Sequence, residues 1–401
     1  MTFTPLPGEA SVMPTYARYP VTLVRGAGCS VWDDEGRAYL DMTGGIGVLS
    51  LGHCHPDWVA AVSEAAGTIG LVSNLYATPP QAALAARLAA LLPIPDARVF
   101  FCNSGAEANE AAIKLIRKRG LPLGKPAIVA LEGSFHGRTV AALAATGQPA
   151  KRAPFEPLVN WFRFVPPGDR ESLRAALAPG DVGGVLLEPV MGEGGVHPLD
   201  DAYLRLVREL CDTHGALFVV DEVQSGFRCG DWLAISHAGV VPDAACLAKE
   251  LGGGLPIGAL VARADVSFGP GEHATTYGGG PVPSSAALAV LEVIERDGLL
   301  VRSLDIGARL AAAVVAAAPA GSIAETRGRG CLGGFELAQA SDGTPADANA
   351  VVLRMLEAGV LASTAGPTVV RMSPPLVATD AEIDRAAVGF GAALAPVEVP
   401  A

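Results

Sequence analysis

An aspartate and a lysine, each at the end of a short apolar run, are the residues of this chain best placed to do chemistry. The run at 216–220 ends in Asp221, and the run at 246–248 ends in Lys249, shortly before three glycines at 252–254. An apolar run that ends in an acid predicts a buried strand that brings its carboxylate to a cleft. A lysine among apolar residues loses solvation, which favours its neutral and nucleophilic amine.

Two interpretations fit this pair. In the first, the two side chains hold pyridoxal phosphate, whose aldehyde bonds to the lysine and whose pyridine nitrogen stays protonated beside the aspartate. In the second, Asp221 caps a helix and Lys249 lies on the surface. The choice depends on the other motifs of the chain.

A polar turn between a predicted strand and a predicted helix offers an anion site. Residues 99–102 form an apolar run, 103–106 read Asn-Ser-Gly-Ala, and 107–119 have a helical pattern. The N–H groups at a helix N-terminus, beside a glycine that allows close approach, can bind a phosphate ester. A simple helix cap without a ligand is the alternative.

Two further loops carry aromatic and charged groups. After the predicted strand 127–131, Phe135 could stack on a planar cofactor and Arg138 could hold a carboxylate with both arms of its guanidinium. Glu188 and Glu193 flank a glycine-rich stretch of the kind that active-site loops use. The alternatives are a core phenylalanine, a surface arginine and a solvated loop.

Two other motifs predict no ligand. The His-Cys-His triplet at 53–55 lacks the spacing of a tetrahedral metal site, so we predict no metal there. Residues 328–333 match the dinucleotide-binding fingerprint by letters, but the strand-like run 335–337 follows where that motif requires a helix.

Composition narrows the class of protein. The 401 residues suffice for a large core and two domains, and 50% hydrophobic residues exclude a disordered chain. A net charge of −12 argues against nucleic acid or an anionic membrane as partner. Seven cysteines without a CxxC pair, no signal-like N-terminus and no apolar run long enough to span a bilayer predict a cytoplasmic protein with reduced thiols.

Strands and helices alternate through the first two thirds of the chain, which predicts a mainly parallel sheet with helices on both faces. The predicted strands are 99–102, 127–131, 184–187 and 216–220, and the predicted helices are 84–92, 107–119 and 201–214. From Ser284 the pattern changes to a helix at 284–296, Ala-rich helices and short runs at 334–337 and 368–372. We interpret this part as a smaller α+β domain that the N-terminal runs 30–32 and 39–40 join.

With these motifs in order, the chain resembles the class III, fold-type I pyridoxal phosphate aminotransferases, and within them the acetylornithine aminotransferases. The most specific stretches are 103–109 and 135–139, and 187–189 with 192–195, 221–226, 247–249 and 275–279 add to them. The resemblance implies an α/β fold whose large domain has a seven-stranded, mainly parallel sheet. It implies an N-terminal segment at 1–54 that joins the small domain, a large domain at 55–290 and a small α+β domain at 291–401.

The resemblance also implies roles around the cofactor. Lys249 would bond to it and later move the proton, Asp221 would pair with the pyridine nitrogen, and Phe135 and Val223 would pack on opposite faces of the ring. Gln224 would lie near the ring oxygen. The other residues expected to bind the cofactor are Ser104, Gly105, Ala106, His136, Glu222 and, from the second subunit, Thr276.

For the substrate, Arg138 would hold the carboxylate remote from the reacting amine, and Thr275 would lie nearby. Arg371 would hold the α-carboxylate of 2-oxoglutarate and would pair with Glu193 when that carboxylate is absent. The implied reaction moves the terminal amine of N2-acetylornithine, or of a similar acylated diamino acid, to 2-oxoglutarate in two half-reactions through pyridoxamine phosphate. A homodimer or a dimer of dimers acting in arginine biosynthesis is implied.

Other activities stay open at this point. The amine donor could be ornithine, succinylornithine, a carrier-linked aminoadipate semialdehyde or 4-aminobutyrate, and a mutase, a racemase or a non-catalytic cofactor-binding protein would use the same scaffold. Three positions depart from the family. Glu250 stands where the family usually has a small residue, and Gly280 replaces the usual asparagine. Residues 48–50 lack an asparagine that is common in the acetylornithine group. Glu250 would either favour the charged form of Lys249 or point into solvent.

Overall fold

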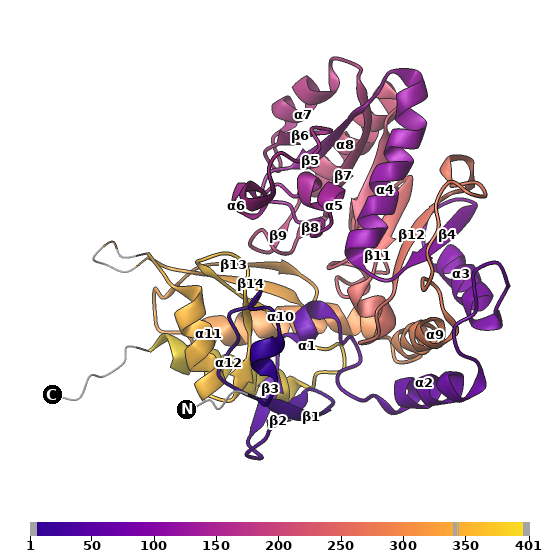
Figure 1. Ribbon diagram of the computed structural model, residues 1–401. Helices are drawn as coiled ribbons and strands as arrows, with labels where there is room; N and C mark the ends of the chain where they lie inside the picture. The colour runs from indigo at the N-terminus through magenta and orange to yellow at the C-terminus, as the bar shows by residue number, and fades with distance from the viewer. Residues whose placement is uncertain (1–5, 340–342, 344, 396–401) are drawn as a thin grey trace.

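The computed structural model describes residues 6–339, 343 and 345–395. Its largest element is a seven-stranded sheet in the order β4-β12-β11-β10-β7-β5-β6 (Figure 1). The strands are β4 (Ala97–Cys102), β12 (Gly258–Arg263), β11 (Ala244–Leu247), β10 (Leu217–Asp221), β7 (Val182–Leu187), β5 (Ala127–Leu131) and β6 (Phe162–Val165). Only β12 runs antiparallel to its neighbours, so the prediction of a mainly parallel sheet is confirmed.

Helices cover both faces of this sheet, which explains why its central strands are apolar throughout rather than alternating. On β10, Leu217 and Val219 pack in one cluster with α4, whereas Phe218 and Val220 pack in another with α7 and α8. The helices of this large-sheet half are α4 (Gly105–Gly120), α5 (Val140–Ala145), α6 (Pro149–Arg152), α7 (Arg170–Leu177) and α8 (Asp201–His214).

Local signals set the bounds of these elements. Helix α8 begins after Asp200, whose carboxylate accepts a hydrogen bond from Tyr203 N at 3.0 Å, and ends at Gly215 in a left-handed conformation. The bounds predicted for this helix and for β5 are confirmed, and β10 is shifted by one residue. Strands β6, β11 and β12 were not predicted, and β6 and β11 have only four residues each.

Two small sheets and three helices form a second, small-sheet half. One sheet has the order β1-β2-β3-β15 and the other β13-β14-β17-β16, so elements from both ends of the described chain lie together (Figure 1). They are β1 (Leu23–Ala27), β2 (Ser30–Asp33), β3 (Ala38–Asp41), β13 (Ile323–Arg329), β14 (Leu332–Leu337), β15 (Val360–Leu361), β16 (Ser363–Thr364), β17 (Val369–Met372), α10 (Leu299–Ala317), α11 (Ala348–Glu357) and α12 (Asp380–Leu394). The domain bounds at 54 and 290 stay a prediction.

The remaining helices and short elements connect the two halves. Helix α9 (Pro281–Arg296) packs against α2 (Pro56–Thr68) and α3 (Pro79–Leu91). It begins earlier than predicted because Pro281 is well suited to a first helical position. The short elements are α1 (Gly44–Gly47), β8 (Val190–Met191) and β9 (His197–Pro198).

Several further findings bear on the weak motifs and on the composition. The fingerprint-like residues 328–333 span the end of β13, the turn and the start of β14, so a strand rather than a helix follows the turn. Among the described residues, no group of three or more His, Cys, Asp or Glu side chains could hold a metal ion. Within the same ranges no helix is long and apolar enough to cross a membrane. All seven cysteines are free thiols.

Candidate active site

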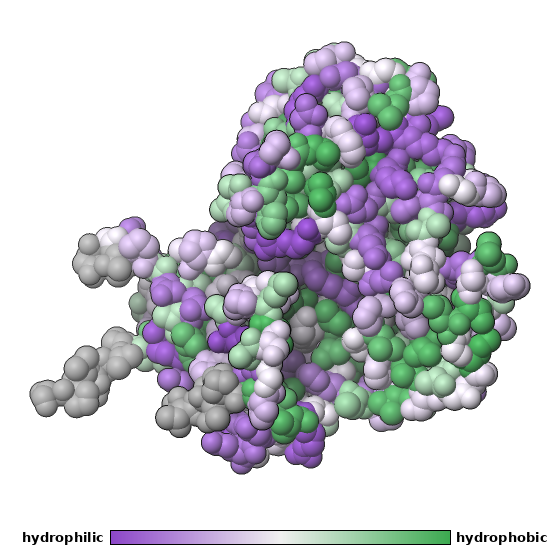
Figure 2. Space-filling view, in the orientation of Figure 1, coloured by the Kyte–Doolittle hydropathy of each residue, from purple (hydrophilic) through white to green (hydrophobic). Residues whose placement is uncertain are grey.

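A cavity of about 400 Å³ lies at the edge of the large sheet where β10, β7 and β11 end. It brings together most of the residues that the sequence singled out. Those that line it are Ser104, Gly105, Ala106, Phe135, His136, Arg138, Glu188, Glu193, Asp221, Val223, Gln224 and Lys249. Figure 2 shows a recess with hydrophilic residues between the two halves of the molecule. The C-terminal ends of neighbouring parallel strands therefore meet at one cavity, as expected for a parallel sheet.

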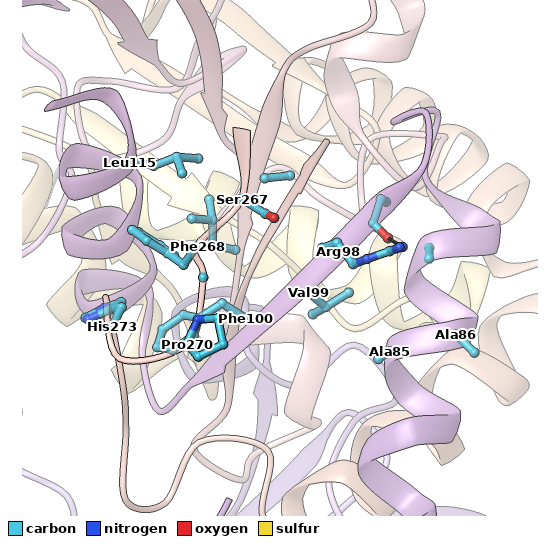
Figure 3. A pocket seen from close by; sticks show the side chains of 15 residues that line it. Ala85, Ala86, Arg98, Val99, Phe100, Leu115, Ser267, Phe268, Pro270 and His273 are labelled. Atoms are coloured by element: carbon cyan, nitrogen blue, oxygen red, sulfur yellow. Dashed lines mark hydrogen bonds between the residues drawn. The ribbon is translucent and has the colours of Figure 1, made fainter. Parts of the chain in front are cut away.

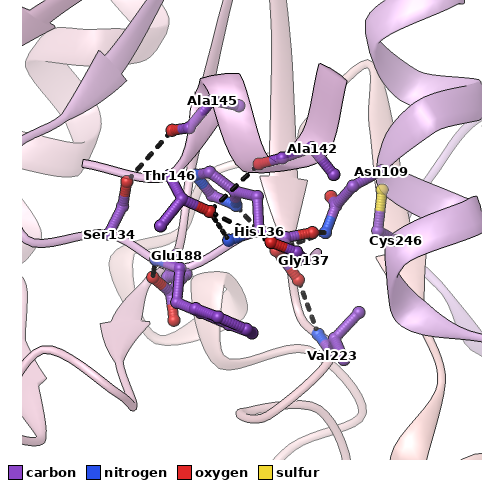
Figure 4. Close-up of polar contacts among 12 residues, drawn as sticks. Asn109, Ser134, His136, Gly137, Ala142, Ala145, Thr146, Glu188, Val223 and Cys246 are labelled. Carbon is purple, nitrogen blue, oxygen red and sulfur yellow. Dashed lines mark hydrogen bonds and ion pairs between the residues drawn. The ribbon is translucent and has the colours of Figure 1, made fainter. Parts of the chain in front are cut away.

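Three donors converge on the buried carboxylate of Asp221, which ends β10 and is 3% exposed. Its Oδ2 accepts a hydrogen bond from Asn109 Nδ2 at 2.7 Å and lies 2.7 Å from His136 Nδ1. Its Oδ1 accepts a hydrogen bond from Val223 N at 3.0 Å (Figure 4). These contacts, from α4 and from two loops, hold the carboxylate in one orientation at the cavity wall.

Asn109 is a site residue that sequence reasoning missed. It lies inside α4, is 1% exposed, and its amide also donates to His136 O at 2.8 Å. A buried asparagine on the apolar face of a predicted helix was the available signal, because burying an amide without partners is costly. Asn109 therefore links α4 to both Asp221 and His136.

Lys249 follows β11 in an unusual backbone conformation, with φ at +31°. Such strain in a residue other than glycine persists only where the surroundings impose it, and it occurs most often at functional sites. Burial lowers the pKa of the Lys249 amine, and nearby carboxylates, Glu250 first and then Glu193 and Asp221, oppose that shift. An amine with a lowered pKa at a cavity wall is a candidate nucleophile.

The N-terminus of α4 opens onto the same cavity. Ser104 caps the helix, and its hydroxyl accepts a hydrogen bond from Glu107 N at 3.2 Å. The N–H groups of Gly105 and Ala106, as the first of the helix, have no acceptor within it. A Cβ atom at Gly105 would lie 2.6 Å from Val223 Cγ1, so only glycine fits there. Glycine and the positive end of the helix dipole together form an anion cradle.

Glu188 joins two loops around the cavity, a role that the sequence left open. Its two carboxylate oxygens accept hydrogen bonds from Phe135 N at 2.8 Å and Gly192 N at 3.1 Å. Burial raises the pKa of Glu188 to about 7, although His136 opposes the rise. The contact holds the backbone of Phe135 beside Glu188, whose side chain Figure 4 shows close to the loop of Ser134 and His136.

Two cations lie near the Phe135 ring. Arg138 Cζ is 5.6 Å and Lys151 Nζ is 5.2 Å from the ring centroid. Burial lowers the pKa of Lys151, Glu193 raises it, and Arg138 lowers it further. Lys151 gave no sequence signal, because it lies in the four-residue helix α6, outside every recognised motif.

The predicted ion pair between Glu193 and Arg371 is formed. Arg371 Nη1 donates to Glu193 Oε1 at 2.6 Å, and Arg371 is 2% exposed although it comes from β17 of the small-sheet half. Burial acts to raise the pKa of Glu193, but Arg371 outweighs it and lowers the pKa below its ordinary value. Gln224 Oε1 lies 3.3 Å from the same guanidinium.

Four predicted site residues do not line this cavity. One is Arg371, which meets the cavity through its ion pair with Glu193. The Glu222 carboxylate accepts hydrogen bonds from Ser225 Oγ and Ile235 N and does not line the cavity, and its predicted cofactor contact stays a prediction. Thr275 and Thr276 line a separate hollow with Asn103. Neither threonine reaches the cavity of its own chain, and a contribution to a second subunit stays a prediction.

A second hollow of about 680 Å³ lies at the edge strand β4 (Figure 3). Its wall is mostly apolar, and Arg98 and His273 are the ionisable side chains that line it. His273 stacks on Phe100, with ring centroids 4.5 Å apart. Without a paired acid and base, this hollow offers less chemistry than the cavity at Lys249.

The cavity fits pyridoxal phosphate. Gly105, whose missing Cβ leaves room at the start of α4, provides a place for the phosphate. The buried carboxylate of Asp221 suits a protonated pyridine nitrogen, and the amine of Lys249 suits an aldehyde. Phe135 and Val223 line the walls between them.

Comparisons with known proteins agree with this geometry. The model of the aminotransferase class-III family matches residues 12–394. An acetylornithine aminotransferase of Thermosynechococcus vestitus is 48% identical, over 96% of this chain and 95% of its own length. That of Mycolicibacterium smegmatis is 46% identical, over 94% of each chain.

Solved structures give the same result. The ornithine aminotransferase from Toxoplasma gondii superimposes with a TM-score of 0.90 at 32% identity, over 96% of this chain and 93% of that one. The N-acetylornithine aminotransferase from Stenotrophomonas maltophilia superimposes with a TM-score of 0.82 at 37% identity, over 94% of this chain and 96% of that one. A further structure of the Toxoplasma enzyme is described with partial occupancy of PLP at its active site. The chain therefore belongs to the class III aminotransferases and is an aminotransferase.

Proposed function

We propose that this aminotransferase uses pyridoxal phosphate to move the terminal amine of N2-acetylornithine to 2-oxoglutarate in two half-reactions. The observation that carries the proposal is the Glu193–Arg371 pair, which stands beside the cavity of Lys249 and Asp221. The names of the relatives supply the donor, because acetylornithine aminotransferases match nearly the full chain at 43–48% identity.

The chain's own groups support this chemistry. When bound, the cofactor would withdraw electrons from the carbon that carries the amine and so make its proton acidic. Lys249, with its pKa lowered by burial, would take that proton and return it at the neighbouring carbon. Asp221, held by Asn109 and Val223, would keep the opposite end of the ring protonated.

Two substrates of different length have to share one site. Arg138, exposed at the cavity mouth, would hold the carboxylate that lies far from the reacting amine. While Glu193 is paired with Arg371, the positive charge of Arg371 is neutralised. The acylated donor, which has no free α-amine, then binds without an unpaired arginine beside it. When Glu193 moves away, Arg371 would bind the α-carboxylate of 2-oxoglutarate.

We also propose a homodimer, in which Thr276 reaches the phosphate of the second subunit. Large hydrophobic side chains are exposed around α2 and α3, where Figure 2 shows hydrophobic residues gathered. Leu75 is 89% and Tyr76 is 69% exposed, and Tyr277, next to Thr276, is 65% exposed. Exposed apolar patches of this kind mark interfaces between proteins.

Ornithine is the second candidate donor, because the Toxoplasma ornithine aminotransferase shares the fold with a TM-score of 0.90. An amine donor without the acyl group would bring a second cation into the cavity. Glu193 is already paired with Arg371 in the closed state, and Lys151 lies close enough to feel both charges, so Glu193 is not free to receive that cation. The acylated donor is therefore the better match.

The deciding experiment is the visible spectrum of the cofactor-loaded protein with N2-acetylornithine and without an oxo acid. We expect the resting band to disappear as pyridoxamine phosphate forms, and to return when 2-oxoglutarate is added. A band that ignores acetylornithine but responds to ornithine would make ornithine the donor. A band that ignores every amine would refute the proposed activity, and turnover without any oxo acid would indicate a mutase or racemase.

A further inference from the structure

The carboxylate of Glu250, next to Lys249 in the chain, is buried rather than directed into solvent. Glu250 and Arg228 are each 1% exposed, and Arg228 Nε donates a hydrogen bond to Glu250 Oε1. Burial raises the pKa of Glu250 to about 7, and contact with Arg228 opposes this rise. A charged pair at this depth is costly to desolvate and adds little stability by itself, so a role beyond stability has to be considered.

Arg228 also connects the pair to the small-sheet half. Its Nη1 lies 3.6 Å from Cys331 Sγ and 3.5 Å from Ser373 O. Its own carbonyl accepts a hydrogen bond from Cys331 N at 3.0 Å. Ser373 follows Arg371 by two residues, so Arg228 touches the segment that carries the carboxylate-binding arginine.

The β13–β14 turn is shaped to meet Arg228. A Cβ atom at Gly330 would lie 2.1 Å from the Arg228 carbonyl oxygen, and the φ of Gly330 is +54°. Only glycine permits this close approach. The glycine-rich motif at 328–333, which resembles a nucleotide fingerprint in sequence, therefore serves as a contact surface for the Arg228 segment.

The Lys249 turn sits at the other end of this chain of contacts. Lys249 has the strained φ of +31°, and a short helical turn at 249–252 follows, with Leu251 N donating to Ala248 O at 2.7 Å. Glu250 lies inside that turn. The charged groups that act on the Lys249 amine are Glu250, Glu193, Arg371 and Asp221.

We propose that Glu250 and Arg228 are positioning residues that hold the strained Lys249 turn in register with Arg371. Glu250 anchors the turn, and Arg228 ties it to the hairpin turn at Cys331 and to the backbone at Ser373. The distance between the reacting amine and the second carboxylate site is thereby set by a buried ion pair. This inference rests on the proposed function for the roles of Lys249 and Arg371.

The test compares Glu250→Gln with the wild-type protein in three measurements. The first is the pH midpoint of the visible band of the cofactor-loaded protein without substrate. We expect it to fall by about half a pH unit or more, because a negative charge that favours the protonated form of the Lys249 nitrogen is gone. The second is kinetics, where we expect kcat to fall about tenfold and KM for 2-oxoglutarate to rise. The third is amide hydrogen exchange at 249–254 in the cofactor-free protein, which should become faster.

Asp243→Asn is the matched control. Asp243 is 3% exposed, pairs with Arg208 at 2.9 Å, and precedes β11 at the end opposite Lys249. This variant should lower the melting temperature but leave the band midpoint, the kinetics and exchange at 249–254 unchanged. If Glu250→Gln behaves in the same way as this control, the pair is only structural and the proposal is wrong.

The double variant Arg228→Met/Glu250→Met separates packing from positioning. Two apolar side chains of similar volume should recover the melting temperature, because no charge stays buried without a partner. We expect the band midpoint and kcat to stay altered. Their full recovery would overturn the proposal. A wild-type protein that binds the cofactor but transfers no amine would refute the proposed function, and the band and exchange comparisons would still test the positioning role.

Discussion

The two sides of the cavity are built in different ways. The side that we assign to the cofactor comes from one sheet, with Asp221 and Lys249 at strand ends and the start of α4 beside them. The side that we assign to the substrate depends on Arg371 and Glu193, which are 178 residues apart and come from different halves. The first side is therefore set by a rigid core, whereas the second depends on an ion pair that can open. We expect mutations on the two sides to affect different steps.

The largest effect is expected for Lys249→Ala, on the cofactor side. Loss of the amine removes both the nucleophile and the group that moves the proton, so turnover should fall by about ten-thousand-fold or more. Steady-state rates with N2-acetylornithine and 2-oxoglutarate measure this. Near-normal rates in this variant would refute the assignment of Lys249.

Asp221→Asn should rank next. The amide keeps the shape but loses the charge that holds the pyridine nitrogen protonated, so both half-reactions should slow by about 10²- to 10³-fold. Stopped-flow absorbance of each half-reaction, on protein shown to have cofactor bound, checks the prediction. A defect confined to one half-reaction would contradict it, because the cofactor side serves both.

Glu193→Gln tests the substrate side and should separate the two half-reactions. Arg371 would lose its counter-charge, so the oxo acid should bind more tightly, while the donor half-reaction should slow by roughly tenfold. Single-turnover measurements with each substrate give the two rates. Equal effects on both half-reactions would show that Glu193 does not distinguish the substrates.

An effect of another kind, on stability rather than on rate, is the dependence of stability on pH. Burial raises the pKa of Glu188 from 4.5 to about 7, so the folded protein keeps a proton that the unfolded chain releases. The stability from this group is complete below pH 4.5 and falls as pH rises through 7, by about 3 kcal/mol.

Glu188→Gln should remove this dependence. In cofactor-free samples, the free energy of unfolding of the variant minus that of the wild-type protein should therefore increase from pH 5 to pH 8. Glu171→Gln, at a side chain that is 91% exposed, is the control and should show no such trend. A pH-independent difference for Glu188→Gln would contradict the raised pKa.

Local chemistry explains what could be predicted from the sequence. Asp200 and Gly215 mark the ends of α8, and the apolar run before Asp221 indicates a buried strand, so these elements and their C-terminal residues follow from short patterns. The partners of Asp221 do not follow in this way. Asn109 lies 112 residues away, inside a helix whose sequence alone does not show which strand it covers.

The departure at Glu250 shows the same limit. Its position beside Lys249 was visible in the sequence, but its direction was not, because the partner Arg228 lies in an irregular segment. Gln224 is similar. A Cβ atom at Gly192 would lie 1.4 Å from Gln224 Oε1, so the glycine is required by a side chain from a distant loop. Such contacts arise from tertiary packing and leave no local pattern.

The parallel pairing of β3 with β15 has a consequence for synthesis of the protein. Leu40 pairs with Val360, so the sheet that β1 to β3 begin is completed only when almost the whole chain has left the ribosome. At about 5–20 residues per second, the N-terminal strands wait roughly 16–64 s for their partner. During that interval the edge of β3 is open to pairing with other chains. Premature termination before residue 360 would therefore yield a chain whose first strands have no native neighbour.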